Sequence, residues 1–233
     1  MIRVWRAALA ASIVAQAAVA RPALAQVPAA AGQRHRFEIA VGGLWIGSAA
    51  LGSGDAELRA NQTPAAPFRL FSTDTRAASA PGFDGRLGYW LTRAIAIEGG
   101  FVRVQPELQT RISADAEDGA PITVAERLDQ YFVDANVLWL LERFRFLGRT
   151  VPFVSGGGGY LRQLHDGRTL IETGQVYNAG GGLRHWLRVR DTTWIRAIGV
   201  RLDGRVYVLV GGVQLEERPR THGALSGSLF LTF

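Results

Sequence analysis

The side chains best suited to catalysis are few in this chain of 233 residues. Enzymes that cleave ester or amide bonds need a nucleophile, a base and an orienting group in one place. The sequence contains no nucleophile-elbow motif and no zinc-binding pair of histidines. We therefore expect no enzymatic activity, no metal and no cofactor. The residues that a lipid-modifying enzyme would have to bring together are His35, His165, His185, His222, Ser226 and Ser228.

A second group of polar side chains alternates with large apolar ones. If each segment is a β-strand, successive side chains point to opposite faces, so the polar group occupies one face of a sheet. When that face lies inside a narrow barrel, its charges must pair, because an isolated buried charge costs several kcal/mol. We expect a network of carboxylates and arginines that plugs the interior. Its candidate members are Glu98, Asp134, Asn136, Arg184, Arg201 and Asp203.

The segments that position these residues have the two-residue period of strands. The clearest is 128–141, where Tyr131, Val133, Val137 and Trp139 share one face. Stripes with a helical period are absent, and glycine is abundant at 28 residues. The sequence thus predicts an all-β fold of eight strands. Their ranges are 36–47, 82–91, 94–104, 128–141, 151–164, 174–187, 193–208 and 221–233.

The predicted connections alternate between long and short. Two long polar segments, 51–80 and 106–125, contrast with a tight turn at 92–93, and 68–71 within the first is a candidate for a short hairpin arm. Outer-membrane barrels show this alternation, with short periplasmic turns and longer outside loops. It predicts an antiparallel up-and-down transmembrane barrel.

Aromatic residues gather near the predicted short turns. An up-and-down barrel would bring these ends to one rim and form an aromatic girdle at the membrane interface. Trp90 and Trp186 fall off the apolar parity of their strands, and core tryptophans of a soluble β domain are the alternative. The girdle candidates are Tyr89, Trp90, Trp139, Trp186 and Trp194.

The first 25 residues have the pattern of a cleaved signal peptide. Arg3 and Arg6 precede the uncharged run 7–20, and Ala23-Leu24-Ala25 offers a small-x-small cleavage site. We expect domain boundaries of 1–25 for the signal peptide and 26–233 for the barrel, with an N-terminal membrane anchor as the alternative. The chain has no cysteine, so no disulfide stabilises it.

Glycines interrupt the predicted strands at 42–43, 99–100, 156–159 and 180–182. None belongs to a phosphate-binding loop or a dinucleotide motif. In a narrow barrel, glycine permits sharp curvature and leaves room for large interior side chains. We expect this structural role.

The last strand ends with Leu229, Leu231 and Phe233 at alternate positions. A final strand with a terminal phenylalanine resembles the assembly signal of outer-membrane barrels. With the alternation above, residues 36–233 resemble the outer-membrane β-barrel domain family, with OmpA- and OmpX-like small barrels as nearest relatives. The resemblance is one of architecture. It implies an outer-membrane location and recognition by the barrel-assembly machinery, and it brings no catalytic residues.

These observations predict an integral outer-membrane protein of Gram-negative bacteria with a structural or surface-interaction role. Outer-membrane lipids surround it, and its long loops would reach an extracellular partner. There are three alternatives: a small porin-like pore, a lipid-modifying enzyme, and a soluble periplasmic lipocalin-like carrier. The carrier would need an apolar interior. The formal charge is +6, but the arginines are scattered and the chain is exported, so nucleic acid is excluded as a partner.

Overall fold

The structure is a computed structural model that describes residues 36–58, 68–114, 119–165, 170–189, 194–213 and 219–233. The predicted signal peptide lies outside these residues and stays a prediction. The described elements are β1 (Phe37–Ile46), β2 (Ala49–Leu58), β3 (Phe68–Ala77), β4 (Ala80–Trp90), β5 (Ile95–Val104), β6 (Glu107–Ser113), β7 (Ile122–Leu140), the 3₁₀ turn η1 (Glu142–Phe144), β8 (Thr150–His165), β9 (Ile171–Val189), β10 (Ala197–Gly211) and β11 (Arg220–Thr232).

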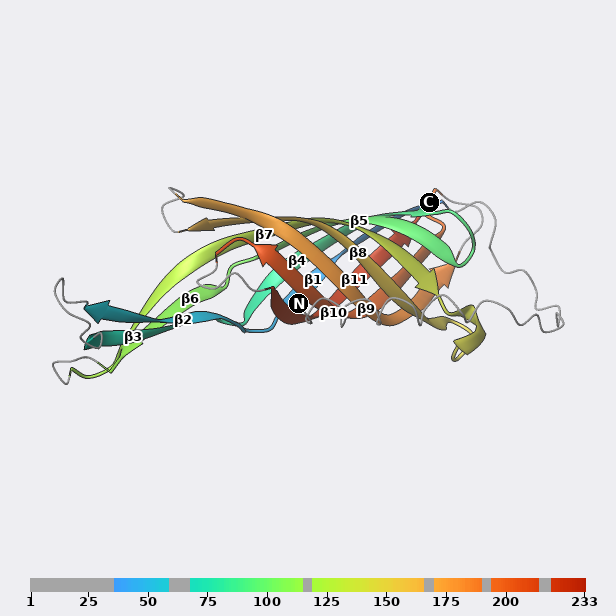
Figure 1. The fold of residues 1–233 in the computed structure, drawn as a ribbon. Coiled ribbons are helices and arrows are strands. Elements are labelled where there is room, and N and C mark those ends of the chain that lie inside the picture. Colours follow the sequence, from blue (N-terminus) through green and yellow to red (C-terminus); the bar gives the residue numbers. More distant parts are fainter. Residues whose placement is uncertain (1–35, 59–67, 115–118, 166–169, 190–193, 214–218) are drawn as a thin grey trace, which may run out of the picture. The chain divides into compact units, whose positions relative to one another are not determined.

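Eight of these strands close into a barrel in which every neighbour is antiparallel. Their order around the wall is β1, β4, β5, β7, β8, β9, β10 and β11, and β11 pairs with β1 to close the ring. Figure 1 shows the strands tilted across one another along the barrel. The predicted fold class, an eight-stranded antiparallel up-and-down barrel, is confirmed.

A four-stranded extension continues the wall beyond one end of the barrel. It is formed by β2, β3, β6 and the first part of β7, paired in that order. Figure 1 shows it at the end opposite to the C-terminus. The sequence had placed these residues mostly in polar loops, which was wrong except for the hairpin arm at 68–71. Apart from Leu51, Thr75 and Ala77, the strands β2 and β3 bury few side chains. They therefore leave little alternating apolar signal, because hydrophobic alternation reports burial and not strand pairing.

The alternation of the barrel strands reflects an apolar outside and a mixed inside. In β5, Ile95, Ile97 and Phe101 are exposed, whereas Ala96 and Glu98 are buried. This is the inverse of a soluble β-barrel, whose apolar side chains fill the interior. The large exposed apolar side chains of the barrel wall include Ile39, Val41, Phe83, Leu87, Val133, Val137, Leu183, Leu202, Val206, Leu225 and Leu229.

The barrel interior has three layers along its axis. One apolar cluster lies toward the extension and includes Ile46, Val104 and Phe132. A second lies toward the short turns and includes Leu138 and Phe153. Charged side chains fill the space between them.

No helical segment in the described part of the chain has the length and hydrophobicity of a membrane-spanning helix.

Candidate functional site

The interior residues singled out from the sequence are all buried inside the barrel. Each has 5% or less of its surface exposed. They come from four different strands and face inward because each occupies the inward parity of its strand. The placements are Glu98 on β5, Asp134 and Asn136 on β7, Arg184 on β9, and Arg201 and Asp203 on β10.

Arg201 forms the centre of the first half of the network. Its two terminal nitrogens donate to the two oxygens of Glu98 at 2.6 and 3.2 Å, a bidentate pairing. Nη2 also donates to Asp203 Oδ2 at 2.8 Å. Arg205 donates to that same oxygen through Nε at 3.0 Å and Nη2 at 2.7 Å. The Arg201 guanidinium carbon lies 4.4 Å from the centre of the Phe153 ring, where the charged layer meets an apolar one.

Asp134 forms the centre of the second half. It accepts a hydrogen bond from Asn136 Nδ2 at 2.7 Å and another from Asn178 Nδ2 at 3.3 Å. Arg86 Nη1 lies 3.5 Å from Asp134 Oδ1, and Arg86 Nε donates to Asp84 at 3.1 Å. The halves meet where Arg205 donates to Asn178 Oδ1 at 3.4 Å.

The two halves together place four carboxylates and three guanidinium groups in one buried layer. Such charges persist inside a protein only when they pair, and removing one member of a buried pair costs about 3–5 kcal/mol. The arrangement therefore ties β4, β5, β7 and β10 together across the lumen. It also places large, hydrogen-bonded side chains in the lumen, in keeping with the narrow interior of an eight-stranded barrel.

Arg184 belongs to a separate site near the short-turn end. It pairs with Glu38, and its guanidinium carbon lies 5.0 Å from the Trp90 ring, 5.5 Å from the Trp186 ring and 4.3 Å from the Phe230 ring. Trp90 Nε1 also donates to Glu38 at 3.2 Å. A guanidinium group over aromatic faces is stabilised by their negative quadrupoles. Aromatic rings and a carboxylate therefore surround Arg184 at this end of the lumen.

The assignment of Trp90 and Trp186 to the interface girdle was wrong. Both pack against the inner apolar cluster instead, because they occupy the inward parity of β4 and β9. The other three candidates lie near the short turns on the outside. Trp139 and Trp194 are exposed, and Tyr89 contacts the exposed Phe37 ring at 5.2 Å. Trp194 also lies 5.1 Å from the Phe233 ring. Near Phe233, Leu229 is exposed on the outer face of β11 and Leu231 is partly exposed.

One strand glycine is required by the network itself. A Cβ on Gly100 would lie 2.1 Å from Asp134 Oδ1 and 2.8 Å from Arg86 Nη1. A Cβ on the adjacent Gly99 would meet nothing within 4 Å. The predicted role of making room for interior side chains therefore applies to Gly100, whereas Gly99 faces outward.

Five members of the two charged sites were missed by the sequence reasoning. They lie at the same parity as recognised members or opposite the apolar residues that had been noted. Asp84 and Arg86 alternate with Phe83 and Leu87 on β4, so extending the parity argument to every strand would have found them. The five are Glu38, Asp84, Arg86, Asn178 and Arg205.

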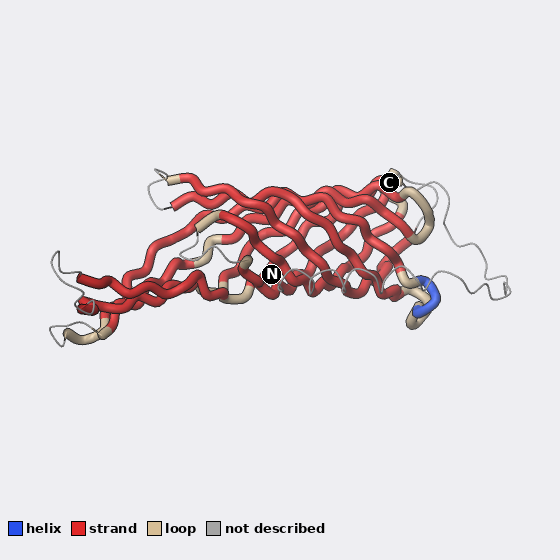
Figure 2. The backbone as a smooth tube through the Cα atoms, in the orientation of Figure 1, coloured by secondary structure: helices blue, strands red, loops and turns tan. Residues whose placement is uncertain are grey.

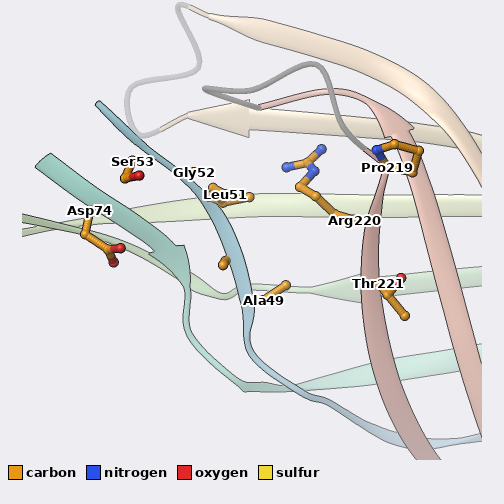
Figure 3. A pocket seen from close by; sticks show the side chains of 9 residues that line it. Ala49, Leu51, Gly52, Ser53, Asp74, Pro219, Arg220 and Thr221 are labelled. Carbon is orange, nitrogen blue, oxygen red and sulfur yellow. The ribbon is translucent and has the colours of Figure 1, made fainter. Parts of the chain in front are cut away.

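Polar side chains also make hydrogen bonds inside the barrel near the extension. Gln163 Nε2 donates to Gln130 Oε1 at 2.7 Å, and its own oxygen accepts from the backbone nitrogen of Val213 at 2.8 Å. Arg220 donates to the backbone oxygens of Val213 and Gly211. Arg220 also lines an open pocket of about 460 Å³ between β2 and β11. Figure 3 shows its side chain there, and the other lining residues come from β2, from Asp74 of β3 and from residues 219 and 221.

The histidines and serines do not assemble a catalytic centre within the described part of the chain. His185 Nδ1 lies 2.8 Å from Thr150 Oγ1, His222 Nδ1 lies 3.1 Å from the Gly47 oxygen, and His165 Nδ1 lies 3.0 Å from Glu126. These are three separate places, and His35 lies outside the described residues. The described residues also contain no group of three or more metal-ligating side chains.

No protein-family model matches the chain, and no curated protein matches it. Among solved structures, the Neisserial surface protein A is similar, with a TM-score of 0.51 and 15% identity over 84% of this chain and 97% of that chain. OprG from Pseudomonas aeruginosa matches with a TM-score of 0.41, 9% identity and coverages of 85% and 97%. The outer membrane protease OmpT from Escherichia coli matches with a TM-score of 0.39, 9% identity and coverages of 91% and 99%. The likeness to the Neisserial protein confirms the predicted resemblance to small outer-membrane barrels at the level of the fold.

Proposed function

We propose that this protein is an integral outer-membrane β-barrel with a structural or surface-interaction role and a lumen closed by side chains. The observation that carries the proposal is the distribution of side chains across the wall. Charges are buried inside, and large apolar side chains such as Leu87, at 65% exposure, cover the outside. In water this outer surface would be a very large exposed apolar patch, which soluble monomers rarely carry.

The backbone supports the same conclusion. Lipid cannot satisfy free N–H and C=O groups, so a membrane-spanning sheet must be closed. The pairing of β11 with β1 removes the edges that an open sheet would expose to lipid.

A lipocalin-like carrier would need the reverse distribution of side chains, with an apolar interior that receives its ligand. In this barrel the interior contains charge pairs. The short turns would face the periplasm and the extension would lie outside the cell.

The closed lumen argues against a pore. Two apolar layers flank the charged one, and Arg201 and Arg86 reach across it to carboxylates on other strands. We expect no steady conductance from the purified protein in planar lipid bilayers. Opening events at low voltage would favour the pore alternative.

The extension supports a surface-interaction role. It carries exposed apolar side chains beyond the end of the barrel, including Leu58, Phe68, Ile122 and Val124. Such residues are typical of surfaces that meet another protein. The barrel-assembly machinery would be a transient partner during insertion.

The deciding experiment is gel mobility of the membrane-extracted protein before and after boiling. A folded transmembrane barrel resists SDS and migrates differently until it is heated. We expect the unheated protein of the outer-membrane fraction to show this shift. A protein found soluble in the periplasm, with identical mobility in both samples, would contradict the proposal and favour the carrier.

A further inference from the structure

The turn 141–149 between β7 and β8 combines exposed apolar side chains with arginines. Its sequence alternates them as Arg143, Phe144, Arg145 and Phe146, and Leu147 follows. Both phenylalanines are exposed, and Leu147 is 93% exposed. A water-filled compartment offers these side chains no favourable contact, since burying one such side chain is worth about 1.5–3 kcal/mol. Contact with an apolar partner would therefore stabilise these exposed side chains.

The backbone of this turn is held in place rather than left irregular. The Phe144 nitrogen donates to the Leu141 oxygen at 2.9 Å, and Phe146 exchanges two hydrogen bonds with Thr150 at 2.8 and 3.0 Å. Leu147 has a φ of +49° and Gly148 a φ of +69°. A leucine rarely adopts this left-handed conformation, because its Cβ crowds the backbone. The turn thus presents an apolar apex at an energetic cost.

The position of the turn makes it continuous with the apolar outer wall. It begins two residues after the exposed Trp139 of β7, whose neighbour on β8 is the exposed Val154. Figure 2 shows η1 at the same end of the barrel as the C-terminus, where the strands end in short turns. The rings of Phe37 and Tyr89 lie together near another turn of this rim, and so do the rings of Trp194 and Phe233. An apolar apex here would lie at the boundary between acyl chains and head groups.

The positive charge of the turns at this rim favours lipids with anionic head groups. In the described residues of the turns 91–94 and 141–149, four arginines accompany a single acidic residue, Glu142. Arginine pairs bidentately with phosphate, and each basic residue near an anionic membrane surface strengthens binding about fivefold. The arginines concerned are Arg93, Arg143, Arg145 and Arg149.

We propose that the turn 141–149 is a lipid-binding anchor. Phe144, Phe146 and Leu147 insert into the leaflet at this rim, and Arg143 and Arg145 bind the phosphates of anionic phospholipids. The arrangement is that of an interfacial segment, whose apolar face enters the acyl boundary while its basic residues remain at the head groups. This inference rests on the proposed membrane location of the barrel.

The absence of native cysteine allows a spin label at one chosen site. We would label three variants, Leu147→Cys, Leu87→Cys and Leu170→Cys, each reconstituted in vesicles of phosphatidylcholine with and without phosphatidylglycerol. Leu87 reports on the barrel wall, and Leu170 is a matched exposed leucine at the opposite end. Collision of the label with oxygen reports lipid exposure, and collision with a nickel complex reports water exposure.

We expect the Leu147 label to prefer oxygen, as the Leu87 label does, and to move deeper when phosphatidylglycerol is added. In R143Q/R145Q this dependence on phosphatidylglycerol should be lost, whereas R111Q/R162Q, at the other end, should retain it. A Leu147 label as accessible to nickel as the Leu170 label would overturn the inference while the Leu87 result upheld the barrel. Spin–spin broadening at Leu147 would assign the turn to a second copy of the chain and overturn it too. Water exposure at Leu87 would overturn the membrane proposal itself, and with it the anchor.

Discussion

The barrel and its extension use the same strand for two different purposes. Residues 128–140 of β7 alternate between buried and exposed positions, whereas residues 122–127 of that strand lie almost wholly exposed. The barrel part pairs with β5 and β8, and the extension part pairs with β6. A strand therefore does not need a buried face to form. What the barrel adds is a closed interior, so its stability should depend on interior contacts that the extension lacks.

The largest expected effect follows from breaking the interior network. Arg201→Ala would leave Glu98 without its bidentate partner in a buried site. We expect a loss of about 3–5 kcal/mol in the free energy of unfolding, because the buried Glu98 carboxylate keeps only a long contact of 3.9 Å to Arg205. Urea unfolding in lipid vesicles, followed by tryptophan fluorescence, measures this loss.

The matched control for this variant lies at the mouth. Arg103 is 46% exposed and pairs with Asp129 at 3.4 Å, so Arg103→Ala should cost less than about 1 kcal/mol. Equal losses in the two variants would mean that water screens the interior as it screens the mouth, and that the network does not stabilise the barrel.

A smaller effect is expected from filling the space that Gly100 leaves. In Gly100→Ala the new methyl group would collide with the Asp134 carboxylate and the Arg86 guanidinium. Crowding of this kind costs about 1–3 kcal/mol, and the same urea titration would detect it. Gly99→Ala is the internal control, because its methyl group would point to open space. A destabilised Gly99→Ala with an unaffected Gly100→Ala would show that the register of β5 is reversed.

We expect that the extension can be disrupted while the barrel stays folded. Thr73 lies in β3, between Gly54 of β2 and Ile112 of β6. In Thr73→Pro the strand loses one backbone donor and should loosen locally by about 1 kcal/mol, the net value of one ladder hydrogen bond. We expect trypsin to cut the extension at Arg69 and Arg76 while the remaining barrel keeps its heat-dependent gel shift. Loss of that shift on proteolysis would contradict the independence of the two regions.

The contrast between the two regions also explains what the sequence could predict. In the barrel, each strand has one lipid-facing side, so residues such as Val133 and Val137 gave a clear two-residue period. Parity then predicted inner-face positions for Glu98 and Arg201, and both side chains are buried. In the extension, Thr73 and Thr75 are paired as strand residues without any apolar alternation, so the same reasoning assigned them to a loop. The assignment of Trp90 and Trp186 failed because closeness to a turn was weighed above parity.

The smallest effect concerns those tryptophans and tests which face of the wall they occupy. Brominated lipids quench only tryptophans that contact the acyl chains. In Trp139→Phe the quenched share of the emission should fall, because Trp139 is exposed on the outer wall. In Trp90→Phe it should not fall, since Trp90 packs inside against Arg184 and Glu38. A lower quenched share in Trp90→Phe would place this ring in lipid, as the girdle hypothesis required, and would leave Arg184 without one wall of its aromatic surroundings.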